Sequence, residues 1–398
     1  KDASETSDAK STQTLDETKD YQKGTDGSDQ KTGKNGAKVT VAAAVGVAAA
    51  QDAVSAKLGD VTVALDNDLT VSASNAANIA TNGDGQASGA KIGVAVGVAL
   101  AISNNSATAS IADGATVTRA GNVNVTAATS KNMANEAGKT DFINGLSALA
   151  YAGASSKKVS VAGALAVDVS NTTTAATIGD NVTMGSASRV GAVNVTADNA
   201  SRMAAKSTSL ARSSGNAGIG ASVAVVVSEN AYTANIGAGA DITSGGVNVA
   251  ATNAKIAPSV PFNFTDLEDF QSNIVSQPLF STGNYYAEAI GGAQSSKVGV
   301  QGSFAVMVFS DVTSAAVGKS LNDPVSTAAS TLDTAGGDVT VSANNAFGAK
   351  ALSGGVALSG KVGVGVSSSV IVNSGSSTAE IARNVQLANV GAVGVTAG

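Results

Sequence analysis

The chain contains no cysteine, histidine or tryptophan, and only 3% of its 398 residues are aromatic. Without histidine there is no imidazole to act as a base near neutral pH or to bind a metal. Without cysteine there is no thiolate nucleophile, iron–sulfur ligand or disulfide. The chemistry that remains is that of carboxylates, lysine, tyrosine and hydroxyl groups. We therefore expect no metal and no cofactor.

Charge is also scarce, at 14% of residues, and the net charge is −6. A nucleic-acid partner requires a basic face, so nucleic acid is not an expected partner. No apolar run reaches the roughly 18 residues of a membrane span. The longest candidates, residues 39–50 and 92–102, are short and rich in glycine and alanine. We expect no membrane span in this sequence.

Small residues dominate what is present, including 45 glycines. Leucine, phenylalanine and tyrosine are too few to fill one thick core. A thin core of valine, isoleucine and alanine, repeated along an axis, is the arrangement that this composition allows.

One unit recurs six times, and each copy is marked by an anchor residue. An alternating apolar run follows each anchor, and a branched apolar residue lies 20 positions after it, with alanine two positions earlier. The anchors are Lys38, Lys91, Lys158, Asn216, Lys297 and Lys361. The branched residues are Leu58, Ile111, Ile178, Ile236, Val317 and Ile381. Anchors are 53, 67, 58, 81 and 64 residues apart, so loop lengths vary while the strand blocks stay constant.

A second block in each copy ends in a short valine-rich segment, such as Val123-Asn124-Val125 or Val193-Asn194-Val195. Period-2 alternation of valine, isoleucine and threonine predicts strands in both blocks. We expect an all-β chain that forms one repetitive β-solenoid, a parallel β-helix, over residues 37–398. If each unit supplied two or three coils, six units would form a rod roughly 60–85 Å long.

The strand after each anchor has one face of branched residues and one face of small residues. The small-residue face is nearly uncharged, whereas a solvent-facing side usually carries charged and polar residues. Two interpretations stay open: a second layer of the chain covers this face, or the face packs laterally against another molecule. The candidate lateral-packing residues are Gly93, Ala95, Gly97, Ala99, Ala162, Ala164 and Ser367.

Three segments depart from the repeat. Residues 1–36 hold 14 of the 54 charged residues and are predicted to form a charged, flexible linker or loop. Insertions occur at about residues 132–155 and 254–295. In the first, Leu146 and Leu149 follow Phe142 at helical spacing; in the second, Thr265 to Glu268 resembles a capping box. Each insertion is predicted to contain one short helix.

Aromatic residues are concentrated in these insertions. They either attach the insertion to the solenoid or form a partner-binding epitope, and both interpretations stay open. The candidate partner-binding residues are Phe142, Phe262, Phe264, Phe270, Phe280, Tyr285 and Tyr286.

Acidic residues give little support for catalysis. Asp66 and Asp68 lack the glycine and distal glutamate of a calcium loop. The repeated strands carry almost no carboxylates, Asp168 being a lone example, whereas β-helical glycosidases cluster them. We therefore expect the protein not to be an enzyme.

The unit also resembles a known family. A Lys-Val-Gly-Val run followed by Ala-x-Ile-Gly, as in Ala176-Thr177-Ile178-Gly179, is similar to repeats of very large bacterial filamentous adhesins, the haemagglutinin-like and leukotoxin-like β-helical exoproteins of type V secretion. The resemblance covers about residues 36–398. It implies a right-handed parallel β-helix, an extracellular or bacterial cell-surface location, and adhesive or matrix-forming work.

Two functions follow as expectations. The first is a structural or adhesive segment of a giant secreted surface protein, a rod that attaches to host surfaces or to other surface proteins. The alternative is a subunit of a self-assembling extracellular filament or sheath that associates through its small-residue face. A trimeric adhesin stalk is less consistent with so long a repeat.

Overall fold

The computed structural model describes residues 39–77, 79–129, 145–255, 284–322 and 328–398. Within these ranges all regular structure is β-strand, without any helix, in a 10-stranded and an 11-stranded sheet. The strand pairs of both sheets are parallel, as between β1 and β4, between β7 and β11, and between β14 and β18. The predicted all-β class and parallel pairing are therefore confirmed.

The segment after each anchor residue forms a long strand, which we call the anchor strand. Each anchor strand has branched and small residues in alternation, which suits a pleated strand with two different faces. The anchor strands are β1 (Val39–Leu58), residues 92–111 of β4 (Ile79–Ile111), residues 159–178 of β7 (Gly145–Ile178), β11 (Ala217–Ile236), β14 (Val298–Val317) and β18 (Val362–Asn373), which β19 (Ser376–Ile381) continues.

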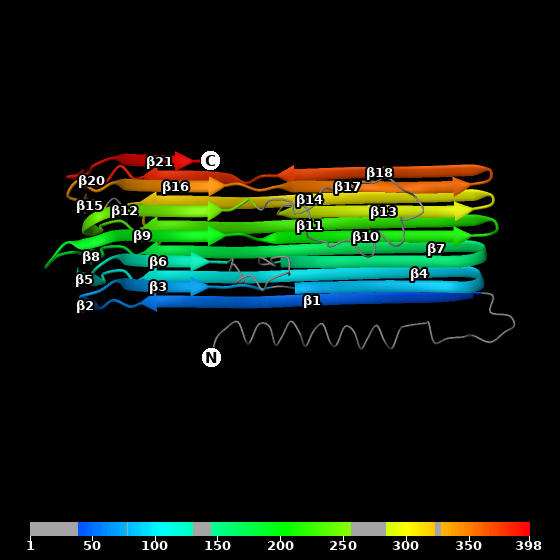
Figure 1. Ribbon diagram of the computed structural model, residues 1–398, viewed down its shortest axis with the longest axis horizontal. Helices are drawn as coiled ribbons and strands as arrows, with labels where there is room; N and C mark the ends of the chain where they lie inside the picture. Colours follow the sequence, from blue (N-terminus) through cyan, green and yellow to red (C-terminus); the bar gives the residue numbers. More distant parts are fainter. Residues whose placement is uncertain (1–38, 78, 130–144, 256–283, 323–327) are drawn as a thin grey trace, which may run out of the picture.

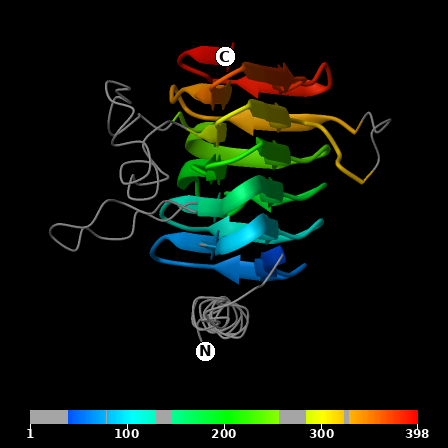
Figure 2. The same ribbon diagram turned by 90° about the vertical axis from the view of Figure 1, so that its right-hand side faces the viewer.

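Consecutive anchor strands pair directly with each other. Ile111 lies opposite Ile178, Ile178 opposite Ile236, and Ile236 opposite Val317, so equivalent positions of the sequence units are neighbours. Each unit therefore adds one layer, and the expectation of two or three coils per unit is wrong. Five spacings of about 4.8 Å separate the first and last anchor strands, about 24 Å in all. The long dimension follows the strands, and the layers stack across it (Figures 1 and 2).

The valine-rich second blocks stack in the same way and are called the valine strands. Short strands in the turn precede them. The valine strands are β3 (Leu69–Ser74), β6 (Val123–Ala128), β9 (Val190–Asn199), residues 247–253 of β12 (Asp241–Asn253), β16 (Val339–Asn345) and β21 (Val393–Ala397). The short turn strands are β2 (Thr62–Ala64), β5 (Thr116–Arg119), β8 (Thr183–Met184), β15 (Ser330–Asp333) and β20 (Val385–Ala388).

A third set, the return strands, leads from each valine strand back to the next anchor strand. The set comprises residues 79–88 of β4, residues 145–156 of β7, β10 (Arg202–Ser213), β13 (Tyr285–Ser295) and β17 (Ala349–Ser359). The chain reverses at the end of each return strand, so Gly83 lies beside Val98 and Gly85 beside Val96. Across the whole stack, the valine and return strands together form one side of the molecule, and the anchor strands form the side that faces it (Figure 1). We call these two sides the facing layers, and we call the stacked units the successive layers.

Two cores lie between these layers. Under the second half of the anchor strands the core is built from valine, isoleucine and alanine, including Ile111, Ile178 and Val195. Under the first half it is built mostly from alanine, such as Ala99 and Ala166. The thin core expected from composition is thus divided along each layer.

The helix predicted for the first insertion is wrong where that insertion is described: Leu146 and Leu149 belong to the return segment of β7, where Leu146 is buried between the layers. The helix predicted for the second insertion, around Thr265 to Ile274, lies outside the described residues. Residues 285–295, the described end of the second insertion, form β13, a strand that is buried along almost its whole length. Phe142 and residues 256–283 lie outside the described residues, as does the predicted linker at 1–36.

Candidate interaction surface

The small-residue face of the anchor strands points into the molecule. Ala95 and Ala99 have no exposed surface, and Ala162 and Ala164 are also buried. Gly93 and Gly97 are buried with them. The prediction of a lateral-packing face is therefore wrong for these six residues. Of the predicted set only Ser367 is exposed, on β18, the last anchor strand described.

The reason is the close approach of the two layers. A Cβ atom on Gly97 would lie 2.0 Å from the backbone oxygen of Tyr151 and 2.6 Å from that of Gly83. A Cβ on Gly220 would lie 2.4 Å from the backbone oxygen of Gly292. Larger side chains cannot fit between backbones this close. The small residues are selected by contact with the return strands of the same chain.

The branched residues consequently face outward. Ile219 is 40% exposed, Val96 37% and Phe304 44%. Across four paired anchor strands these side chains form rows perpendicular to the strands, because parallel in-register pairing places equivalent residues side by side.

Six such rows, named after their member in β7, form a continuous surface that we call the apolar face. The Val159 row holds Val39, Ile92, Val159, Ala217, Val298 and Val362; the Val161 row holds Val41, Val94, Val161, Ile219, Val300 and Val364; the Gly163 row holds Ala43, Val96, Gly163, Ala221, Gly302 and Val366; the Leu165 row holds Val45, Val98, Leu165, Val223, Phe304 and Ser368; the Val167 row holds Val47, Leu100, Val167, Val225, Val306 and Val370; and the Val169 row holds Ala49, Ile102, Val169, Val227, Val308 and Val372.

The apolar face ends abruptly halfway along the anchor strands. The next outward row holds Gln51, Asn104, Asn171, Glu229 and Ser310, and further rows are rich in serine and threonine. No charged residue occurs in the six apolar rows. Sequence alternation identified both faces correctly, but the assumption that the branched face pointed inward hid this surface. The repeated glycines of the other face were the available signal, since glycine columns indicate close backbone approach.

The predicted aromatic epitope is not accessible where it is described. Tyr285 is 2% exposed and Tyr286 6% exposed, so neither forms an open contact surface. Tyr285 stacks on Phe309 with ring centroids 4.8 Å apart, and Phe347 packs edge-on against both rings. The prediction is wrong for these two tyrosines. Phe142, Phe262, Phe264, Phe270 and Phe280 lie outside the described residues.

A buried polar seam separates the two cores at the end of the valine strands. Thr129 donates its hydroxyl to Asn199 Oδ1 (2.8 Å), Asn199 Nδ2 donates to Asn253 Oδ1 (2.8 Å), and Asn253 Nδ2 donates to Asn345 Oδ1 (3.0 Å). Side-chain amides can both donate and accept, so the hydrogen bonds continue without a break through the four layers from β6 to β16. Sequence reasoning missed this ladder, although the residue always lies four positions after a valine such as Val195 or Val249.

Asp311 lies on the anchor side of this seam. It accepts hydrogen bonds from Asn230 (2.8 Å), Tyr285 and Asn253 (3.2 Å). Burial raises the pKa of the Asp311 carboxyl, and these hydrogen bonds oppose that rise. Burial likewise raises the pKa of the Tyr285 hydroxyl well above its usual range. A carboxylate with this many donors is a structural acceptor within the core.

Asp168 is the lone acid that the sequence placed in a repeated strand. It is fully buried, and burial raises the pKa of its carboxyl well above the usual range. The Ala204 backbone N–H lies close enough to oppose this rise, although neither carboxyl oxygen meets the geometry of a hydrogen bond. The neighbouring layers carry Ala101 and Val226 at the same position.

The return strands carry a buried ion pair. Lys206 and Glu288 are opposite each other in β10 and β13, with Nζ and Oε1 3.4 Å apart, and both side chains are almost fully buried. Tyr286 donates its hydroxyl to Glu288, and the pKa of Tyr286 is raised, first by burial and then by this carboxylate. The pair links two layers, and its burial distinguishes the return strands from the uncharged apolar face.

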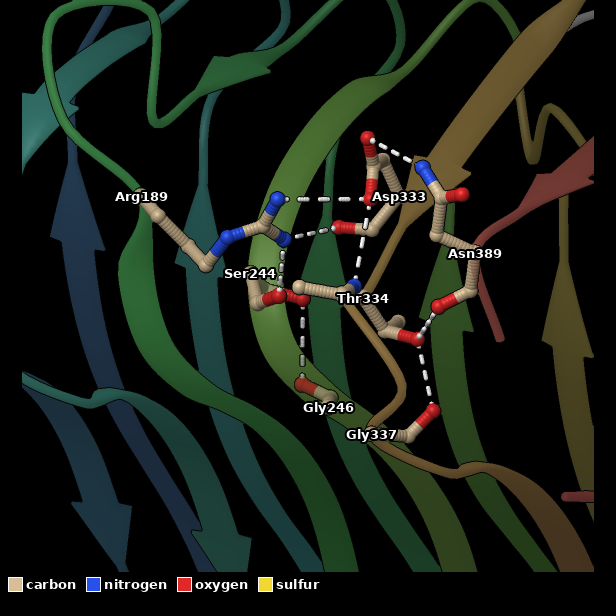
Figure 3. Close-up of polar contacts among 8 residues, drawn as sticks. Arg189, Ser244, Gly246, Asp333, Thr334, Gly337 and Asn389 are labelled. Atoms are coloured by element: carbon tan, nitrogen blue, oxygen red, sulfur yellow. Dashed lines mark hydrogen bonds and ion pairs between the residues drawn. The ribbon is translucent and has the colours of Figure 1, made fainter. Parts of the chain in front are cut away.

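A polar clasp joins the turns at the opposite end of the layers. Arg189 Nη1 donates to the backbone oxygens of Ser244 (2.6 Å) and Asp333 (2.9 Å), and Asn389 Nδ2 donates to Asp333 Oδ2 (3.2 Å), as Figure 3 shows. The Ala335 backbone N–H is the largest of several contacts that lower the pKa of the partly exposed Asp333 carboxyl. These contacts span four successive layers and serve to align their turns.

The same end carries an open pocket of about 410 Å³ beside Asp113 and Asp180. Asp113 accepts from the Asp180 backbone N–H (2.8 Å) and from Asn322 (3.2 Å). Asp180 accepts from the Ala238 backbone N–H (2.9 Å) and from Ser320 (2.5 Å). All four carboxyl oxygens therefore serve the turns. Within the described ranges no three side chains of the metal-ligating types gather, and no helix is long and apolar enough to span a membrane.

Comparisons with known proteins give no relative: no family model, no curated protein and no solved structure matches the chain.

Proposed function

We propose that this chain is a structural, adhesive segment of a giant secreted bacterial surface protein, and that it is not an enzyme. In this proposal it is a right-handed parallel β-helix of six repeats, located outside the cell and attached to host surfaces or other surface proteins. The single observation that supports it most is the one-for-one pairing of equivalent residues through successive layers, as for Ile111, Ile178 and Ile236. Such stacking produces a scaffold in which the strands of each layer pair with those of its neighbours.

The polar groups described above are consistent with this proposal. The seam through Asn199, the ion pair of Lys206 with Glu288 and the clasp of Arg189 each connect layers. Each of them supports stacking, and the carboxylates of Asp113 and Asp180 that line the pocket at the turns accept hydrogen bonds from neighbouring turns.

Adhesion can be tested with beads coated with the full 398-residue chain. Attachment to bacterial and mammalian cells is measured against beads carrying the heat-unfolded chain and beads carrying an unrelated protein of equal net charge. We expect attachment only for the folded chain. Equal attachment of all three bead types would reject adhesion. A density map of the protein at atomic resolution would decide the handedness.

The alternative of a self-assembling filament is favoured by one observation, the uncovered apolar face, and no longer by the small-residue face. Light scattering and negative-stain electron microscopy on concentrated protein distinguish the two functions: open-ended fibres support the filament, and discrete particles support the adhesive segment.

A further inference from the structure

We propose that the apolar face binds the same face of a second copy of this chain, forming a two-fold dimer. The dimer itself is inferred from the side chains of the described sheet. Only its biological purpose rests on the structural role proposed above. A face-to-face dimer would double the scaffold into two solenoids side by side, with the polar rows left at its margins.

The first argument is exposure. Outward side chains in internal anchor strands, such as Val96, Ile219 and Phe304, are 37–44% exposed. An open sheet face of this size that carries apolar residues at every position but Ser368 is unusual for a soluble monomer. The boundary is equally informative, because the same strands become polar outward from Asn171 and Glu229 onward. A fold that merely tolerated valine on its surface would not need so sharp a boundary.

The second argument is area. Eleven residues at about 3.3 Å each and five strand spacings of about 4.8 Å give a face of roughly 850 Å². A standard stable interface buries about 800 Å² on each partner. The apolar face alone therefore meets the requirement of a specific dimer.

The third argument is the fit of the face to itself. Consider a two-fold axis that follows the stacking direction between the Gly163 row and the Leu165 row. This axis superposes the Val159 row on the Val169 row and the Val161 row on the Val167 row, so all six rows find a partner.

At the centre of that arrangement the Gly163 row meets the Leu165 row of the other copy within the same layer. Gly163 then faces Leu165, and Gly302 faces Phe304. The space above Gly163 is open, since a Cβ there would meet no atom within 4 Å. The two largest side chains of the Leu165 row thus lie opposite the two glycines. Packed sheets usually cross at about 30°, which displaces residues least near the axis.

Other occupants fit the face less well. A membrane surface is usually bound by aromatic and cationic side chains at the margin of the buried area, whereas Phe304 is the only aromatic residue in the six rows. The described ends of the two insertions, Thr129 with Gly145 and Lys255 with Asn284, lie between valine and return strands in the other layer. The apolar face of a second copy is itself a flat, uncharged surface of the same size.

The dimer is tested by sedimentation velocity on the full chain from about 1 to 100 µM, a range around the affinity of weak to moderate interfaces. We expect a concentration-dependent dimer. The double variant Leu165→Glu and Phe304→Glu should weaken dimerisation at least roughly 10-fold, because it buries charge at the centre of the interface. Its matched control, Thr173→Glu and Ser310→Glu, adds the same charge to the polar rows of the same strands and should dimerise like the parent.

Chemical cross-linking tests the geometry, because the chain has no cysteine of its own. A short bismaleimide should join Ala221→Cys to Val223→Cys in an equal mixture faster than it joins either variant to itself. Ala231→Cys, in the polar half of the same strand, should not cross-link. Faster cross-linking of Ala231→Cys, or a parent chain that stays monomeric, would overturn the proposal.

Three further measurements separate the alternatives. Circular dichroism and the urea midpoint of the glutamate variants show that both fold; if the interface variant unfolds, Val161→Thr with Val223→Thr replaces it. Flotation with lipid vesicles covers the membrane: vesicle binding by a monomeric parent chain would overturn the dimer. Loss of dimer with intact bead attachment rejects this inference alone, whereas a dimer without attachment rejects the adhesive function alone.

Discussion

The two halves of the anchor strands differ in which kind of side chain they bury. In the first half the small residues, such as Ala99 and Ala166, lie between the layers, and the branched residues lie outside. In the second half Ile111 and Ile178 lie inside, and serine, threonine and asparagine lie outside. The alternation has the same period in both halves. The distance to the facing layer, not hydrophobicity, decides which side chains are buried.

The largest effect is expected where the layers are closest. Gly97→Val should destabilise the fold by about 3 kcal/mol or more, because its side chain would overlap the backbone oxygens of Tyr151 and Gly83. Gly163→Val is the matched control in the next layer, with open space around the new Cβ, and should change the free energy of unfolding by less than about 1 kcal/mol. Urea unfolding measures both. Equal destabilisation by the two variants would show that the face assignment is wrong.

This comparison also shows what the sequence could predict. Period-2 alternation predicted the strands, and the constant distance from Lys91 to Ile111 predicted which residues would be neighbours, as the pairing of Ile111 with Ile178 shows. Alternation does not say which face is inside. That choice depends on how closely the anchor strands approach the return strands of the facing layer. The alternation within one strand carries no information about this distance.

Other features depended on the same long-range contacts. The number of layers per sequence unit was overestimated because the return strands were not distinguished from loops. Met203 to Ala211 nevertheless alternates weakly between large and small residues. The burial of Tyr285 follows from its hydrogen bond to Asp311 and its stacking on Phe309, neither of which the local sequence reveals.

The second effect concerns the seam between the halves. Asn199→Ala should cost about 2–4 kcal/mol, because it removes hydrogen bonds to Asn253, Tyr232 and Thr129 and leaves their polar groups buried. Asn194→Ala, in the same strand but on the outer side, removes a single bond to Asn124 and should cost less than about 1 kcal/mol. Similar urea midpoints for the two variants would contradict a structural role for the seam.

The third effect is a stabilisation in the alanine-rich half. The folded pKa of Asp168 is raised, so the folded state holds a proton that the unfolded state releases above about pH 4. Stability from this group is therefore full below about pH 4 and is lost as the pH rises through the folded pKa.

Asp168→Val, which matches Val226 in the next layer, should raise the free energy of unfolding at pH 7 by about 1–3 kcal/mol and remove this pH dependence. Asp168→Asn should remove the pH dependence with less stabilisation, because it remains polar. Urea unfolding at several pH values between 4 and 8 is the measurement. A parent chain whose stability does not fall across this range would refute the assignment.

The smallest effect is expected on the apolar face itself. Val161→Thr replaces a methyl group by a hydroxyl on a partly exposed outward side chain, so it should change the free energy of unfolding by less than about 0.5 kcal/mol. Val195→Thr makes the same exchange in a fully buried side chain of a valine strand and should cost about 1–3 kcal/mol, since its hydroxyl loses water. Val161 and Val195 are both valines in alternating strands, and only their distance from the facing layer separates them. If Val161→Thr proved as costly as Val195→Thr, the apolar face would be buried in solution. A partner molecule would then stay bound to it even at the low protein concentration of the unfolding measurement.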